Sequence, residues 1–135
     1  MSKLKKSLGT ILNIDGSKLS DDFVLAAESS GLIEKALSGQ AEDLMELRRA
    51  YSLTEAATKN YGKTNEEVNN YIKEHGLTNI GGLLGENGAN LVNDWNTIVE
   101  GMKTMDWDEI LNNQGMQSAI GNVLSAMTDL DSGTQ

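Results

Sequence analysis

Apolar residues recur at intervals of three and four positions along most of the chain, which is the spacing of one face of an α-helix. No segment shows the strict alternation of apolar and polar residues that is typical of a half-buried strand. We therefore expect an all-α fold, with five to seven helices in a single compact or partly extended helical bundle. The pattern places these helices over residues 2–13, 20–37, 40–61, 64–75, 77–105, 106–111 and 116–127.

Several helix ends carry recognisable capping residues. Ser20 precedes two acidic residues and can cap the second helix. Residues 64–67 and 106–109 each begin with an oxygen-bearing side chain and end in glutamate, which is the spacing of a capping box. Gly76 can end the helix before it as a C-cap, and Gly31 is a soft point inside the helix expected over 20–37.

The helix expected over 40–61 has a long seam that becomes polar towards its end. Alanines beside this seam would let another helix approach closely. The seam residues are Leu44, Leu47, Tyr51, Thr54, Thr58 and Tyr61, and the alanines are Ala50, Ala56 and Ala57.

Residues 77–105 carry the most regular stripe, in steps of four and three, which is the period of helix packing. Gly81 and Gly85 form a GxxxG pair, in which the missing side chains let helix backbones approach closely. The pattern favours helix or near-helix throughout, although residues 85–88 can open into a turn between a short helix and a longer one. We expect these stripe residues to bind a partner: Leu84, Gly88, Leu91, Trp95, Ile98, Met102 and Met105.

Charge is distributed unevenly along this chain of net charge −9. Residues 1–60 contain 8 basic and 9 acidic side chains, whereas residues 61–135 contain 3 basic and 11 acidic ones. Lysines 3, 5 and 6 lie opposite the apolar face of the first helix. We expect a single helical domain over 1–128, in which 1–14 form an amphipathic basic arm, followed by a flexible acidic tail over 129–135.

These properties limit the partners and the location. Phosphate binding needs a basic surface, so nucleic acid is not an expected partner. A membrane is disfavoured because acidic residues interrupt the glycine-rich segment, although its Gly-Leu-Leu-Gly run resembles the composition of fusion peptides. The apolar run after the first lysines is too short for a secretory signal. We expect a protein of the cytoplasm or of a virion.

The residues that carry chemistry do not form a catalytic pattern. The chain has no cysteine, and its one histidine, His75, is expected to be a polar residue of a last helical turn. The carboxylates of Asp106, Asp108 and Glu109 fit a helix cap better than an acid–base pair. We therefore expect no catalytic residues, no metal and no cofactor.

The remaining hypothesis is a non-enzymatic structural or assembly protein that packs its helices against itself or a larger partner. A bacteriophage tail, connector or internal head protein would fit this character, although no motif supports that assignment. Two alternatives stay open. One is an acidic inhibitor or adaptor that uses residues 61–135 to block a basic protein surface, and the other is a membrane-penetrating protein centred on residues 77–105.

Overall fold

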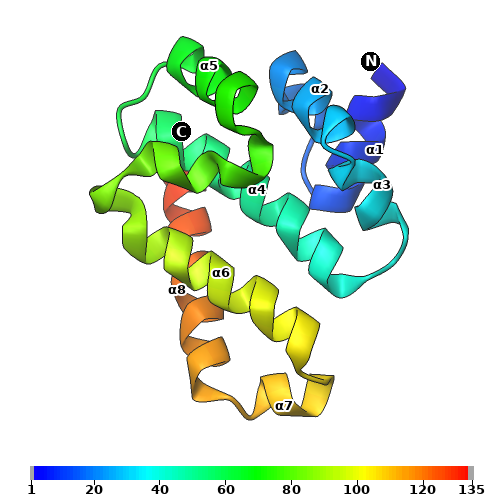
Figure 1. Ribbon diagram of the computed structural model, residues 1–135, viewed down its shortest axis with the longest axis vertical. Helices are drawn as coiled ribbons and strands as arrows, with labels where there is room; N and C mark the ends of the chain where they lie inside the picture. Colours follow the sequence, from blue (N-terminus) through cyan, green and yellow to red (C-terminus); the bar gives the residue numbers. More distant parts are fainter. Residues whose placement is uncertain (1, 134–135) are drawn as a thin grey trace.

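The computed structural model confirms an all-α fold (Figure 1). It describes the backbone of residues 2–133 and the side chains of residues 4–17 and 19–126. No strand occurs in this part of the chain. The elements, with η for a 3₁₀ helix, are α1 (Ser2–Leu12), η1 (Gly16–Lys18), α2 (Asp21–Ser29), α3 (Leu32–Leu37), α4 (Ala41–Lys59), α5 (Asn65–His75), η2 (Leu77–Leu84), η3 (Glu86–Gly88), α6 (Ala89–Thr104), α7 (Trp107–Leu111) and α8 (Gln114–Gly133).

Helix α4 is the central element, and α1, α3, α5, η2, α6 and α8 all contact it (Figure 1). Its first half joins a cluster of buried residues with α1, α2 and α3, to which it contributes Leu47 and Ala50. Its second half joins a cluster with α5, η2, α6 and α8, to which it contributes Leu53 and Ala57. The two clusters are therefore joined through one helix.

Helix α1 follows the predicted segment closely, and it packs through Leu8 and Leu12. The chain then reverses, because Asn13 adopts a left-handed conformation with φ 60° and the Ile14 N–H donates to the carbonyl of Gly9 at 2.9 Å. Gly9 and Gly16 touch at this reversal, since a Cβ on Gly9 would lie 2.7 Å from the Gly16 Cα. The two glycines thus bring the end of α1 against η1.

The predicted basic arm is tied down by an ion pair. Lys5 Nζ lies 2.7 Å from Asp21 Oδ1 at the start of α2. The hydrogen bond from Lys5, followed by its positive charge, lowers the pKa of Asp21 below the usual 3.8. The side chain of Lys3 lies outside the described residues. Lys5 therefore joins α1 to the start of α2.

The Lys5–Asp21 pair predicts an acid-sensitive contribution to stability. Because the pKa of Asp21 is lower in the folded chain than in the unfolded one, the pair stabilises the fold above the unfolded pKa. This contribution is lost as the pH falls through the folded pKa. An Asp21→Asn variant should unfold at lower urea concentration than the parent at pH 7, and the gap should narrow below about pH 4. A gap that stays constant between pH 7 and pH 3 would contradict the assignment.

The predicted capping residues are confirmed. Ser20 Oγ accepts a hydrogen bond from the Phe23 N–H at 3.1 Å. The Thr64–Glu67 and Asp106–Glu109 pairs form complete capping boxes at the starts of α5 and α7. The single helix expected over 20–37 is wrong, because Gly31 at φ 80° separates α2 from α3.

The seam expected on α4 is only partly right, because Leu47 is buried and Leu44 is half-buried. Tyr51, Thr54, Thr58 and Tyr61 are only half-buried. The face that packs is turned towards the three predicted alanines, all of which are fully buried. The buried residues of α4 are Leu47, Arg49, Ala50, Ser52, Leu53, Ala56 and Ala57.

Residues 77–105 do not form one helix. The segment Leu77–Leu84 is a 3₁₀ helix, the chain turns through η3, and an α-helix begins only at Ala89. The turn occurs inside the predicted 85–88 segment. Gly76 at φ 88° and Gly85 at φ 64° bound the 3₁₀ segment, in conformations that side-chain-bearing residues rarely adopt.

The end of the chain also differs from the expectation. The backbone of α8 continues as a helix to Gly133, beyond residue 128, where we placed the end of the helical domain. Residues 134–135 of the predicted tail and the side chain of Met127, predicted for the apolar face of the last helix, lie outside the described part of the chain.

Candidate functional site

The seven residues predicted to bind a partner lie mostly in the core of this chain. Leu84, Gly88, Trp95 and Ile98 are buried by the chain's own helices. The other three, Leu91, Met102 and Met105, are half-buried. Helix α6 packs against both α4 and α8, and these contacts cover most of its stripe. A partner could reach the buried four only if the chain opened, and accessible surface for a partner must be sought elsewhere.

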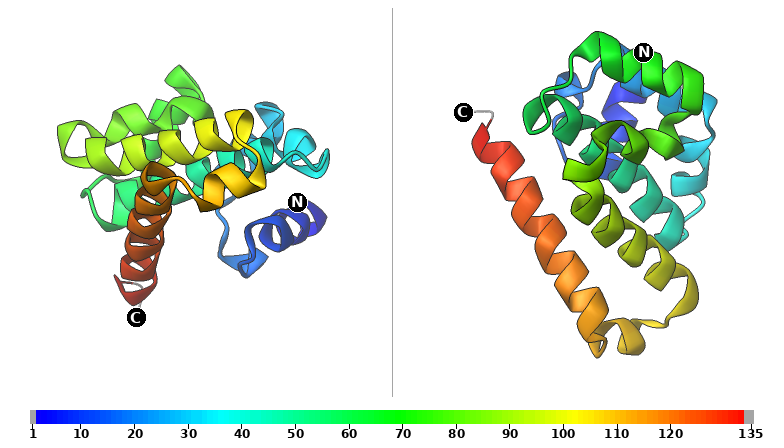
Figure 2. Two further views of the ribbon diagram at one scale, coloured as in Figure 1. Left: turned by 90° about the horizontal axis from the view of Figure 1, so that it is seen from below. Right: turned by 60° about the vertical axis from the view of Figure 1, so that its left-hand side comes forward.

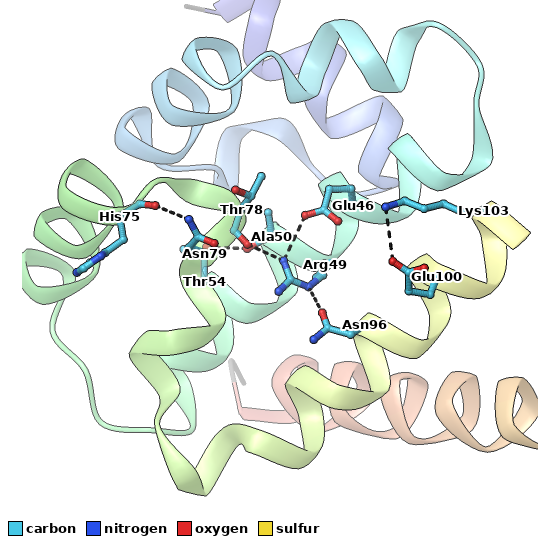
Figure 3. Close-up of polar contacts among 10 residues, drawn as sticks. All are labelled: Glu46, Arg49, Ala50, Thr54, His75, Thr78, Asn79, Asn96, Glu100 and Lys103. Atoms are coloured by element: carbon cyan, nitrogen blue, oxygen red, sulfur yellow. Dashed lines mark hydrogen bonds and ion pairs between the residues drawn. The ribbon is translucent and has the colours of Figure 1, made fainter.

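Arg49 explains why the glycine-rich segment is fixed against α4 (Figure 3). Its Nε donates to Asn96 Oδ1 on α6 at 2.9 Å, and its Nη1 donates to the Thr78 carbonyl on η2 at the same distance. Nη1 also pairs with Glu46 Oε1 at 3.2 Å. The Arg49 side chain is buried, and a Cβ on Gly81 would lie 3.6 Å from its Nη2. One guanidinium therefore binds α4, η2 and α6 together.

A second buried polar contact joins α4 to α6. Trp95 Nε1–H donates to Ser52 Oγ at 3.2 Å, and both residues are buried. Ser52 thus satisfies the only polar atom of the Trp95 side chain. This contact fixes the orientation of the indole inside the second cluster.

Removing the Ser52 hydroxyl should cost a modest amount of stability. A Ser52→Ala variant leaves the buried indole N–H without an acceptor, so we expect the free energy of unfolding to fall by about 1–2 kcal/mol. Urea unfolding followed by Trp fluorescence measures this, with Ser125→Ala on the exposed side of α8 as the matched control. Equal midpoints for the two variants would contradict a role for the hydroxyl.

A groove runs between the end of α1 and helix α8, with α4 as its floor. Figure 2 shows α1 and α8 projecting to the same side of the layer that α4 and α6 form. The groove has a volume of about 500 Å³. Its lining is mainly apolar, with Ile14 on the α1 side, Met45 and Tyr51 on the floor, and Ile120 and Leu124 on the α8 side. We call this the α1–α8 groove.

Arg48 lies in the floor of the α1–α8 groove and differs sharply from its neighbour Arg49. Its Nε is buried and has no hydrogen-bond partner, and no other described side chain has a buried nitrogen or oxygen in that state. Glu55 and Lys59, also on the floor, pair with each other at 3.8 Å. Arg48 Nε is therefore a buried donor that the described residues do not satisfy.

The outward side of α8 lacks charge. No charged residue occurs from Ile110 to Thr128, the longest uncharged stretch in the sequence. Met116, Ala119 and Val123 are buried against the rest of the chain. The other side is exposed and contains small or amide residues together with Leu124, which is 61% exposed. We call this side, made of Gln117, Ser118, Gly121, Asn122, Leu124 and Ser125, the α8 outer face.

The polar and acidic residues that the sequence analysis assigned to helix ends lie at helix ends in the structure. His75 occupies the last turn of α5, as expected, and its ring lies against the Tyr71 ring with 4.3 Å between centroids and the planes tilted by 36°. Asp106 and Glu109 are engaged in their capping box. Within the described residues, no three histidine or acidic side chains are grouped closely enough to hold a metal ion. These positions offer no assembled acid–base pair.

Pattern reasoning missed Arg48, Arg49 and Ser52. Arginine and serine are mostly exposed residue types, so the hydrophobic periodicity gave no reason to place them in the core. A usable signal existed for Arg49, since Leu53 lies four residues later on the same side of the helix and is buried. Nothing in the sequence marks the groove, because its walls are far apart along the chain.

Two further observations concern membranes and relatives. None of the helices in the described part of the chain is long and apolar enough to cross a membrane. Comparisons with protein-family models, with curated proteins and with solved structures give no match for this chain.

Proposed function

We propose that the protein is a non-enzymatic assembly subunit that associates with a second copy of itself through the α8 outer face. The observation that carries this proposal is an exposed, uncharged helix side with a prominent leucine in a chain of net charge −9. Exposed helix sides of globular proteins usually carry charged residues. The proposed function thus moves the contact from the α6 stripe to α8.

Charge is the reason for choosing α8 over other surfaces. Two copies of an acidic chain repel one another wherever acidic residues face each other. None of the six residues of the α8 outer face is charged, so this face is free of that repulsion. It also presents Leu124, whose burial in a contact would be favourable by the hydrophobic effect.

The test is the oligomeric state measured by light scattering over a concentration series. The parent protein should form a dimer or a larger assembly. A Leu124→Glu variant should dissociate at least about tenfold more readily, because it places a carboxylate in an apolar contact. Leu37→Glu is the matched control, since Leu37 is similarly exposed but lies on α3. A parent that stays monomeric at all concentrations overturns the proposal.

The salt dependence of binding distinguishes this proposed self-association from the alternative function as an acidic inhibitor or adaptor. Self-association through an uncharged face should persist or strengthen as salt screens the repulsion between acidic copies. Binding of residues 61–135 to a basic protein should instead weaken steeply. A bacteriophage virion is one setting for such a subunit, and it stays a prediction because it rests on general character alone.

A further inference from the structure

We infer that helix α7 is the contact point for a different protein, and that it binds an amphipathic helix whose apolar stripe is flanked by lysine or arginine residues. The contact uses residues other than those of the α8 outer face and does not depend on the proposed self-association. It gives the subunit a second binding surface, for a partner of opposite charge.

Two large apolar side chains are exposed on the same side of α7. Trp107 is 63% exposed and Leu111 is 54% exposed. They are four residues apart, so they are neighbours along the helix surface. A single exposed leucine is ordinary on a protein surface, whereas tryptophan is enriched among the residues that dominate binding energies. Side chains four residues apart form the ridges through which helices pack against each other, so this apolar ridge suits an incoming helix.

Helix α7 holds the apolar ridge in a fixed and accessible position. Figure 1 shows α7 at one end of the molecule, where the chain passes from α6 to α8. Ile110 is buried, α7 packs against α8, and Gln117 Nε2 donates a hydrogen bond to the Leu111 carbonyl. The Asp106–Glu109 capping box fixes the start of the helix. A surface that is already ordered loses little conformational entropy when it binds.

The charge around the apolar ridge indicates the kind of partner. Asp106, Asp108 and Glu109 are all exposed, and no basic residue follows Lys103 in the sequence. The ion pairs of the described residues include none of these three carboxylates. Asp108 lies about 100° round the helix from Trp107, so a negative charge is next to the ridge. An apolar stripe flanked by lysine or arginine is complementary to this combination.

The same charge argues against two other occupants. A second copy of the chain has a net charge of −9 and repels an acidic surface. Anionic lipid headgroups repel it as well, and helices that lie on membranes usually carry lysine or arginine beside their apolar face. A basic amphipathic helix is attracted by the carboxylates, and its apolar stripe can cover Trp107 and Leu111.

Fluorescence anisotropy of a labelled peptide tests the inference. The probe is a leucine–lysine peptide that forms a basic amphipathic helix, and the comparison peptide has the same number of lysines with serine in place of leucine. The parent protein should bind the leucine–lysine peptide at least about tenfold more tightly than the serine–lysine peptide. Trp107→Ser should lower the affinity for the leucine–lysine peptide at least about tenfold. Leu37→Ser, which removes a similarly exposed side chain from α3, should leave this affinity unchanged.

The electrostatic part of the contact has its own variant. Asp108→Asn removes the carboxylate that lies beside the apolar ridge and is not part of the capping box. It should weaken binding of the leucine–lysine peptide by about threefold at low salt, and by less at high salt. Glu34→Gln, which removes an exposed carboxylate from α3, is the matched control. Equal effects of these two variants would overturn the assignment of a basic partner to α7.

Other outcomes would overturn the inference as a whole. If the parent and Trp107→Ser bind the leucine–lysine peptide equally well, or the parent binds both peptides equally well, charge alone attracts the peptide. Binding to neutral phosphatidylcholine vesicles that is lost in Trp107→Ser would identify a lipid surface as the occupant. If Trp107→Ser dissociates the assembly measured by light scattering, α7 contacts a second copy. The proposed self-association fails separately, when the parent is monomeric at all concentrations.

Discussion

Replacing Arg49 with methionine is expected to lower the free energy of unfolding by about 3 kcal/mol. Methionine keeps an apolar stem but removes the guanidinium that donates to Asn96 Oδ1 and to the Thr78 carbonyl. Because these two hydrogen bonds hold η2 and α6 on α4, their removal should destabilise the chain more than the removal of one surface hydrogen bond. Urea unfolding followed by circular dichroism measures the change.

The neighbouring arginine provides the control for this prediction. An Arg48→Met variant changes the same chemical group one position earlier on α4, where Nε has no partner among the described residues. Its free energy of unfolding should change by less than about 1 kcal/mol when compared at a concentration where the parent is monomeric. Similar losses in the two variants would show that Arg49 does not have the central role that its hydrogen bonds indicate.

Replacing Gly9 with alanine is expected to destabilise the fold by about 2 kcal/mol. The new Cβ would lie 2.7 Å from both the Cα and the N of Gly16, and 2.9 Å from the Ile14 carbonyl oxygen. All three atoms belong to the backbone, which cannot move aside as the end of a long side chain can. The clash outweighs the usual gain of about 1 kcal/mol when alanine replaces glycine inside a helix.

Gly121→Ala is the matched control, and its effect should have the opposite sign. Gly121 also lies inside a helix, but a Cβ there would meet no atom within 4 Å. We expect the free energy of unfolding of the monomer to rise by about 0.5–1 kcal/mol. Thermal melts of the two variants in dilute solution compare them. If both variants lose stability, the close approach of Gly9 to Gly16 is not the reason that Gly9→Ala is destabilising.

Sequence patterns predicted the parts of the fold that depend on neighbouring residues. The caps at Ser20, Thr64 and Asp106 were found because each side chain bonds a backbone N–H three residues ahead. The break at Gly31 was seen only as a soft point, since glycine inside a helix is tolerated at a cost. The choice between a bent helix and two helices depends on packing that periodicity does not contain.

The stripe over 77–105 shows where periodicity misleads. Its residues are indeed buried or half-buried, although the first eight positions of the segment form a 3₁₀ helix and most of the remainder an α-helix. A repeated spacing reports that one side is covered, and it cannot say whether the cover is another copy or the same chain. The α1–α8 groove could not be predicted, because α1 and α8 meet only after α4 has placed them.

The 3₁₀ segment Leu77–Leu84 has a consequence for the dynamics of the chain. Runs of 3₁₀ helix longer than three or four residues are uncommon, because their hydrogen-bond geometry is poor. This one has eight residues, with a glycine of positive φ at either end, and the buried Arg49 of α4 donates a hydrogen bond to its Thr78 carbonyl. Its amides should therefore exchange with deuterium as one cooperative group, at a lower opening energy than those of α4. The exchange rate of that group would then report how often the hydrogen bond between Arg49 and the Thr78 carbonyl breaks.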